Sequence, residues 1–370
     1  MEKRDRFLTV GPLTPQDVDE VSELYAQVFR AGHKSDLAEI SGYIRKVFLN
    51  RETTSAQGES VLCRDSQGVV AAAVLALPMK ITCFNDVITA RLLCCLMKNA
   101  QSSQANAAIY QLCVAMHPRS QDFCFTDTAA PRSIEFVRTG GGEMLPFQTM
   151  NWRRVFRPLS FIVSRRFRHS GVFAPLIRLS ARIGDLFVRN IIQGLSAAPA
   201  DELSVKPIET EEFRSIAEEL TSRFSIRPTW DKEEFAWLVA AAIANPVLGS
   251  MSVRAVLDRE GKVAGAYLYF LDNHGLARVF HVVHQKEKAA GVLKCLFAEL
   301  DEAGAYAATG MAQTDLLIPL SRESRVSYRY RGGFCVLSKH AHVIDALRRN
   351  DVYLGGFYSE SWNRLAMDFG

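Results

Sequence analysis

Residues 8–29 read LTVGPLTPQDVDEVSELYAQVF, and residues 203–224 read LSVKPIETEEFRSIAEELTSRF. The two stretches align without a gap, and Leu, Val, Pro, Glu and the closing Phe recur in register. Each predicts a short strand, a turn at the proline, an acidic first helical turn and an amphipathic helix. Self-similarity at a fixed spacing indicates repeated structural units. We therefore expect Leu8 and Leu203 to hold equivalent places in two units.

Further blocks repeat in the same order. Residues 61–77 and 255–271 each predict a hairpin of two apolar strands with an Asp-x-x-Gly turn, closed by Gly68 in the first half and by Gly261 in the second. A strand and a helix follow in each half. The strands are expected at 90–97 and 277–284, and the helices at 105–114 and 289–300. Each half thus predicts a mixed α/β unit with a mostly antiparallel central sheet.

The chain has 370 residues, which is long for one hydrophobic core and suits two domains. We predict an N-terminal domain at 1–158, a linker at 159–200 and a C-terminal domain at 201–370. The linker carries basic side chains among Phe, Leu and Ile at helical spacing, namely Arg165, Arg166, Arg168, Arg178, Arg182 and Arg189. One interpretation is a connecting helix that buries its apolar face between the domains. The other is a basic helix resting on a membrane surface or an acidic partner.

Composition excludes several classes of protein. With 48% hydrophobic and 23% charged residues, the chain resembles ordinary folded proteins rather than disordered ones. A net charge of +4 gives no support for nucleic-acid binding. The charged N-terminus is not followed by an apolar segment, so we expect no signal peptide, no transmembrane segment and a cytoplasmic location. The eight cysteines show no CxxC spacing and are interpreted as small buried hydrophobes.

The most specific stretch is residues 125–159. It predicts a strand ending in Thr126-Asp127, a helix, a turn at residues 140–142 and a strand that carries Trp-Arg-Arg from Trp152 onward. Together with the repeat, these motifs resemble the GNAT acyltransferase superfamily. They are most similar to tandem GNAT N-acyltransferases of a bacterial type, some of which are associated with polysaccharide biosynthesis. The resemblance covers most of the chain and implies two tandem GNAT folds.

In this family a loop of the form [QR]-x-x-G-x-[GA] binds the pyrophosphate of acyl-CoA at the start of a helix, where unpaired N–H groups and the helix dipole favour an anion. Here Gln101 matches the first position, but Gln104 and Asn106 replace the glycines. A helix N-cap built from Ser102 or Ser103 is the alternative interpretation. The resemblance places the cofactor on the strand residues Leu96, Met97 and Lys98 and on the loop residues Gln101, Ser102, Ser103, Gln104, Ala105, Asn106 and Ala107.

Catalytic residues are harder to assign. Ala130 and Val137 stand where many family members carry an Asn and a Tyr that protonates the leaving thiolate. Asp127 is the candidate catalytic residue, as a base or an amine-binding group, and the alternative is that it caps the next helix. In the second half, residues 285–288 form a shortened loop that we do not expect to bind CoA. The histidines have no metal-binding pattern, so no metal is expected.

The resemblance implies an acyl-CoA-dependent N-acyltransferase. Its co-substrate would be acetyl-CoA or another acyl-CoA, and its acceptor a small primary amine, such as an amino sugar or an amino-acid-like group, that attacks the thioester directly. One alternative is a non-catalytic tandem GNAT protein that binds a ligand or a partner protein. Another is a transferase of aminoacyl groups from tRNA, which the mild charge disfavours. The oligomeric state is not predicted.

Overall fold

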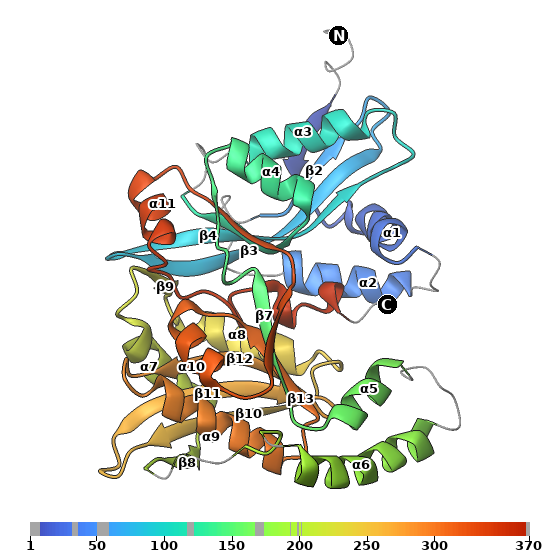
Figure 1. Ribbon diagram of the computed structural model, residues 1–370. Helices are drawn as coiled ribbons and strands as arrows, with labels where there is room; N and C mark the ends of the chain where they lie inside the picture. The colour runs from blue at the N-terminus through green and yellow to red at the C-terminus, as the bar shows by residue number, and fades with distance from the viewer. Residues whose placement is uncertain are drawn as a thin grey trace.

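The computed structural model describes residues 8–31, 36–49, 59–116, 122–166, 174–192, 194–197, 200 and 202–367. Figure 1 shows two β-sheets, one above the other, with helices between them and on their outer faces. In both sheets the strand pairs are antiparallel, except for one parallel pair near the middle of each. This confirms the predicted class of two mixed α/β units.

The first sheet has the order β1-β2-β3-β4-β5-β15-β6. A short extra strand, β9, pairs with the far end of β3. The strands are β1 (Thr9–Pro12), β2 (Val61–Arg64), β3 (Val70–Cys83), β4 (Asp86–Lys98), β5 (Cys124–Ala129), β6 (Glu143–Met144), β9 (Ile226–Pro228) and β15 (Gly333–Leu337).

The second sheet has the order β8-β10-β11-β12-β13-β7-β14. Its strands are β7 (Met150–Val155), β8 (Ser204–Pro207), β10 (Ser250–Leu257), β11 (Val263–Leu271), β12 (Leu276–His284), β13 (Ala307–Met311) and β14 (Val326–Tyr330). Position by position, this order matches that of the first sheet. Leu8 and Leu203 each directly precede the equivalent edge strands β1 and β8.

The two halves of the chain exchange their last strands. β7 belongs to the first half of the sequence but lies between β13 and β14. β15 belongs to the second half but lies between β5 and β6. Each sheet is therefore completed by a strand from the other half, which ties the two sheets together. The domain limits at 158 and 200 remain a prediction about folding units.

The predicted hairpin turns are the same in both halves. Gly68 and Gly261 both have positive φ angles, 79° and 80°, in a region that favours glycine. The carboxylate of Asp65 accepts hydrogen bonds from the N–H groups of residues 67 and 69. The carboxylate of Asp258 accepts the equivalent bonds from residues 260 and 262. This match confirms the repeat at the level of single hydrogen bonds.

The helices form three layers (Figure 1). A central hydrophobic core contains side chains of α1, α2, α7 and α8 together with buried side chains from both sheets. α3 and α4 cover the outer face of the first sheet, and α9 covers that of the second. The helices are α1 (Val18–Phe29), α2 (Leu37–Ile44), α3 (Ala105–Ala115), α4 (Pro131–Thr139), α5 (Pro158–Arg166), α6 (Ala174–Ile191), α7 (Thr210–Thr221), α8 (Lys232–Ile243), α9 (Ala289–Glu302), α10 (Leu317–Arg322) and α11 (Ala341–Arg348), with short turns η2 (Arg45–Leu49), η5 (Thr314–Leu316), η6 (Glu360–Trp362) and η7 (Arg364–Ala366).

The linker forms the helices α5 and α6, which lie beside the second sheet and away from the first (Figure 1). The prediction that its apolar side chains are buried between the domains is wrong for both helices, since no residue of α5 is buried and Ile162 is exposed. Leu179, Leu186 and Phe187 are exposed, because α6 contacts the protein through its opposite face at Ala181 and Asp185. Arg168 and the side chain of Arg178 lie outside the described residues.

Candidate functional site

The candidate site begins where two parallel strands separate. β4 and β5 pair only at Arg91 with Cys124 and at Leu92 with Phe125. Immediately beyond this point β4 holds one more residue than β3 between the pairs Ala76–Leu93 and Val74–Leu96. Such a β-bulge bends a strand and increases its twist. Beyond the bulge β4 runs along β3 alone, and a gap opens between β4 and β5.

A cavity of 550 Å³ occupies this gap. Its volume falls in the range of about 300–1,000 Å³ that is usual for small-molecule sites. Its walls come from β4, β5, α3 and α4 and are mostly apolar. They consist of Phe29, Val74, Leu93, Cys94, Leu96, Lys98, Asn106, Ile109, Tyr110, Cys113, Met116, Thr126, Thr128, Ala129, Ala130, Arg132, Ser133, Phe136, Val137 and Leu337.

Only some of the residues predicted to bind the cofactor line the cavity. Leu96, Lys98 and Asn106 line it. Met97 points to the other face of the sheet and is fully buried in the central core. The remaining predicted residues form the turn before α3 and its first residues, and they do not line the cavity. They are Gln101, Ser102, Ser103, Gln104, Ala105 and Ala107.

Hydrogen bonds hold the turn before α3. The N–H of Gln101 donates to the Asn99 side chain at 2.9 Å. The N–H groups of Gln104 and Ala105 donate to Ser102, to its hydroxyl and its carbonyl oxygen respectively. Within the described residues, the backbone N–H of Asn106 has no acceptor. α3 has no side-chain N-cap, so the alternative of a cap built from Ser102 or Ser103 is not what forms.

A carboxylate lies behind this turn. The hydroxyl of Ser102 donates to Asp65 Oδ2 at 2.7 Å. Burial alone would raise the pKa of Asp65, but the hydrogen bonds from Ser102 and from two backbone N–H groups outweigh it and lower that pKa below its ordinary value. Asp65 therefore places negative charge near the start of α3. Lys98 places a positive charge on the cavity side of the same helix start, where its Nζ donates to Asn106 Oδ1 at 3.1 Å.

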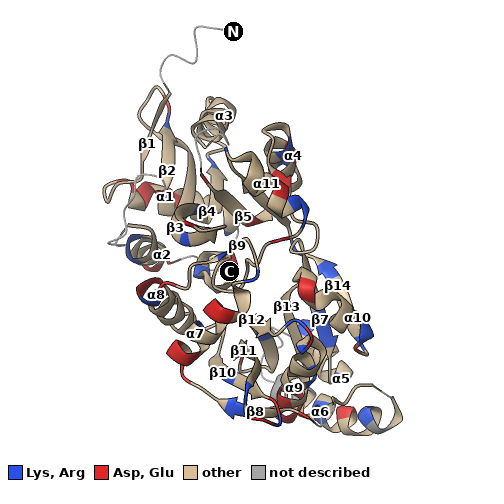
Figure 2. Cartoon of the chain, turned by 90° about the vertical axis from the view of Figure 1, so that its left-hand side faces the viewer, with Lys and Arg blue, Asp and Glu red and all other residues tan. Residues whose placement is uncertain are grey.

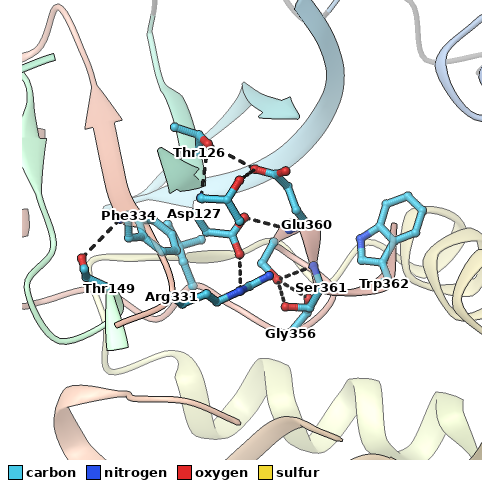
Figure 3. A network of polar contacts seen from close by, with 12 residues as sticks. Thr126, Asp127, Thr149, Arg331, Phe334, Gly356, Glu360, Ser361 and Trp362 are labelled. Carbon is cyan, nitrogen blue, oxygen red and sulfur yellow. Dashed lines mark hydrogen bonds and ion pairs between the residues drawn. The ribbon is translucent and has the colours of Figure 1, made fainter. Parts of the chain in front are cut away.

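Asp127 is fully buried in a network that Figure 3 shows. Its Oδ2 lies 2.5 Å from Nη1 of Arg331, and its Oδ1 accepts a hydrogen bond from the backbone N–H of Glu360 at 3.0 Å. It does not cap α4, whose N-cap is Ala130 without a side-chain hydrogen bond. The capping interpretation is therefore wrong. The catalytic role of Asp127 remains a prediction.

Glu360, which the sequence did not single out, lies behind the cavity wall. Thr126 and Thr128 line the cavity, and their hydroxyls donate to Glu360 Oε1 at 3.1 and 2.9 Å. Burial first, and then the nearby charge of Asp127, raise the pKa of Glu360 well above its ordinary value. A carboxyl group with a raised pKa behind two hydroxyls can accept a proton passed on from the cavity.

The positions that the family resemblance marked for an Asn and a Tyr do face the cavity. Ala130 and Val137 both line it, but neither side chain can donate a proton. Hydroxyl groups come instead from Tyr110 on α3 and Ser133 on α4. Tyr110 lies in the predicted helix after β4, where the 3.6-residue period also places Asn106 on the cavity side.

The equivalent gap in the second sheet is filled by the chain itself. β12 and β13 pair from Leu276 to Val279 and then separate. The segment 351–358 enters there: the side chain of Gln313 donates to the carbonyl oxygen of Leu354 at 2.6 Å, and the N–H of Phe357 donates to His281 Nε2 at 3.0 Å. A side chain at Gly356 would meet the carbonyl oxygen of Phe280 at 2.4 Å.

No protein-family model matches the sequence. No curated protein matches it either.

Solved structures do match. A GCN5-related N-acetyltransferase from Anabaena variabilis is 11% identical, with a TM-score of 0.57 over 91% of this chain and 74% of that chain. A probable N-acyltransferase from Enterococcus faecalis is 12% identical, with a TM-score of 0.55 over 89% and 72%. A glucosamine N-acetyltransferase region of a fungal multi-domain β-N-acetylglucosaminidase is 12% identical, with a TM-score of 0.51 over 89% and 38%. The chain thus has the fold of GCN5-related N-acetyltransferases along most of its length, in two copies.

Proposed function

We propose that this protein is an acyl-CoA-dependent N-acyltransferase that uses the cleft between β4 and β5. The observation that carries the proposal is the 550 Å³ cavity, which opens where these strands separate and whose walls are mostly apolar. The acyl donor would be acetyl-CoA or another acyl-CoA. The acceptor would be a small primary amine, such as an amino sugar or an amino-acid-like group.

The free edge of β4 supports this placement of the cofactor. β4 pairs with β3 along its length but with β5 at only two positions, so its backbone from Leu93 to Lys98 can hydrogen-bond to the amides of a pantetheine chain. The pyrophosphate would lie at the start of α3. There, within the described residues, the backbone N–H of Asn106 donates to no protein acceptor, as is usual in a first helical turn, and the helix dipole and Lys98 favour an anion.

The chemistry needs no covalent enzyme intermediate. The amine nitrogen attacks the thioester carbonyl carbon, a C–N bond forms, and the C–S bond breaks to release CoA as a thiolate. The proton lost by the amine passes to the hydroxyl of Thr126 or Thr128, whose own proton moves to the carboxylate of Glu360. In this scheme Asp127 positions Glu360 by accepting its backbone N–H. The thiolate takes a proton from water at the mouth of the cavity, near the exposed Tyr110.

One feature favours the second candidate, a tandem GNAT protein that binds a ligand without catalysis. The carboxylate of Asp65 bonds to Ser102 and so weakens an anion site at α3, and no glycine allows the ligand a closer approach. Release of free CoA thiol from acetyl-CoA, measured with a panel of amino sugars and amino acids, separates the candidates. Binding of acetyl-CoA without any thiol release would support the second.

Binding itself is tested with a matched pair of variants in calorimetry with acetyl-CoA. Ala107→Glu puts a carboxylate beside the expected pyrophosphate and should weaken binding at least about tenfold, or about 1.4 kcal/mol. The fold should tolerate it, because acidic residues suit a first helical turn. Ala290→Glu puts a carboxylate into the first turn of α9 and should leave binding unchanged. Equal losses would mean two working sites. Binding unaffected by either variant would place the cofactor elsewhere.

A further inference from the structure

The helix α6 turns an unusually apolar face outward. Leu176, Leu179, Ile183, Phe187 and Ile191 recur every three or four residues, and between half and four fifths of each side chain is exposed. Phe187 is 67% exposed and Ile191 is 80% exposed. Single exposed apolar side chains are common. A continuous stripe of them, however, marks an interaction surface for another protein or a membrane.

Contacts on the opposite side of α6 keep this apolar face directed outward. The carboxylate of Asp185, on the opposite side of α6, accepts the N–H groups of Leu159 and Ser160 at the start of α5. Arg189 pairs with the buried Asp301 of α9 at 2.7 Å. α6 is thus held by α5 and by the second sheet unit through one side. Its apolar stripe therefore stays on the outside as long as the fold is intact.

The charged side chains of α5 and α6 are basic, with one exception. Asp185 is the only acidic residue between 158 and 191, and it is buried. Arg165, Arg166 and Arg182 are exposed, and none of them forms an ion pair with an acidic side chain in the described part of the chain. In Figure 2 the basic segments of β14, β7, α10 and α6 lie along one side of the second sheet. The unpaired guanidinium groups of Arg165, Arg166 and Arg182 attract anions to α5 and α6.

A basic pocket adjoins α5. It has a volume of 400 Å³, and its polar lining includes Arg153, Arg165, Arg182 and Arg278. The guanidinium of Arg153 lies 5.1 Å from the ring centre of Phe161, and its buried Nε makes no hydrogen bond to any described residue. The one carboxylate in the pocket, Asp272, is already bound to Arg278 at 3.1 Å. The pocket therefore offers unpaired guanidinium donors to a phosphate group.

We propose that α5 and α6 form a docking surface for an anionic phospholipid membrane. The apolar stripe enters the boundary between headgroups and acyl chains, and the arginines, including those of the basic pocket, contact lipid phosphates. Among the described helices, none combines the length and the apolar character that a transmembrane span requires. A second copy is the less suitable partner, because a two-fold pairing of α5 and α6 would bring the arginines of both copies together, while the single carboxylate of these helices, Asp185, is buried.

The test is co-sedimentation of the full chain with vesicles of phosphatidylglycerol and phosphatidylcholine in equal parts, and with vesicles of phosphatidylcholine alone. The protein should bind the anionic vesicles, and added salt should weaken that binding. Phe187→Asp should lower the partition coefficient at least about tenfold, because it puts a charge into the apolar stripe. The double variant Arg165→Glu with Arg182→Glu should lower it by a similar factor and reduce the salt dependence.

Two matched controls lie in the first sheet unit, away from α6. Val87→Asp changes a comparably exposed apolar residue at the β3–β4 turn, and Arg349→Glu reverses an exposed charge after α11. Both should bind vesicles like the unchanged protein. The proposal is overturned if the protein binds neither kind of vesicle, if it binds both equally, or if the controls lose as much binding as the α6 variants. It is also overturned if the protein binds no vesicles and light scattering shows a dimer that Phe187→Asp dissociates, because the stripe would then be an interface between two copies.

Discussion

The cleft between β4 and β5 and the cleft between β12 and β13 arise in the same way but have different contents. In each, a parallel pair of strands separates after a few residues beside a bulge in the earlier strand. The first cleft is left as a cavity of 550 Å³. In the second, the segment 351–358 lies between the strands and bonds to His281 and Gln313.

This difference shows how a duplicated fold can separate its roles. The segment that fills the second cleft runs on, within a few residues, to Glu360, which lies behind the cavity wall of the first. The second copy therefore cannot bind a ligand in its cleft in this conformation. Instead it delivers a buried carboxyl group to the first copy. The exchange of β7 and β15 fixes the two copies so that this contact can form.

The largest expected effect is at Gly356, which has φ of +59° and no room for a side chain. Gly356→Ala adds the cost of a left-handed non-glycine residue, about 1–2 kcal/mol, to the cost of displacing its neighbours, about 1–3 kcal/mol. The matched control is Gly261→Ala, since Gly261 also has a positive φ but has open space around it. In urea unfolding, Gly261→Ala should lower the free energy of unfolding only by the cost of the left-handed conformation, about 1–2 kcal/mol. Equal losses would mean that the segment does not fill the second cleft tightly.

The next effect is on catalysis. Glu360→Gln keeps an oxygen for the hydroxyls of Thr126 and Thr128 but cannot accept a proton. Under the proposed mechanism kcat should fall about a hundredfold, and the rise of activity with pH should disappear. Since the pKa of Glu360 is raised in the fold, its contribution to stability is present at low pH and is lost as pH rises through that pKa. Glu360→Gln should therefore be at least as stable as the parent at neutral pH.

A control separates this effect from general damage. Glu234→Gln removes another buried carboxylate, which accepts the N–H of Lys80 on the far end of the first sheet. It should lower the free energy of unfolding and leave the pH profile of activity in place. If Glu360→Gln kept both kcat and the pH profile, Glu360 would be a structural residue and the proton would leave by water.

Much of the fold was predictable because its signals are local. The Asp-x-x-Gly turns at Gly68 and Gly261 fix two hairpins, and apolar periodicity identified the strands and helices of both halves. The exchange of β7 and β15 was not predictable. A strand pattern shows which face of a strand is apolar, but it carries no information on which sheet the strand joins. For the same reason the pattern of α6 predicted an apolar face but not that this face would be exposed.

In the candidate site, too, residues close together in the sequence were predictable and those that only folding brings together were not. The family resemblance marked Leu96, Lys98 and Asn106, and all three line the cavity because they lie on one strand and on the helix that follows it. Glu360 was missed because it reaches Thr126 and Thr128 only through folding, from the other end of the chain. Asp127 was seen in the sequence, but its partner Arg331 and the contact with the Glu360 N–H are equally distant along the chain. A motif at the end of a strand cannot by itself show whether a carboxylate faces a ligand or the core.

The smallest effect concerns the filling of the second cleft. His281 accepts the N–H of Phe357, and burial lowers its pKa to about 3. In the unfolded chain a histidine binds a proton below about pH 6.5, so its stabilising contribution is complete above that pH and is lost as pH falls. Between about pH 6.5 and about pH 5.5 this loss should be about 1 kcal/mol in urea unfolding. His281→Gln should remove the loss, whereas the control His274→Gln, on an exposed turn, should keep it. An unchanged pH slope in His281→Gln would mean that His281 titrates normally, as it would if water reached it and the cleft were open.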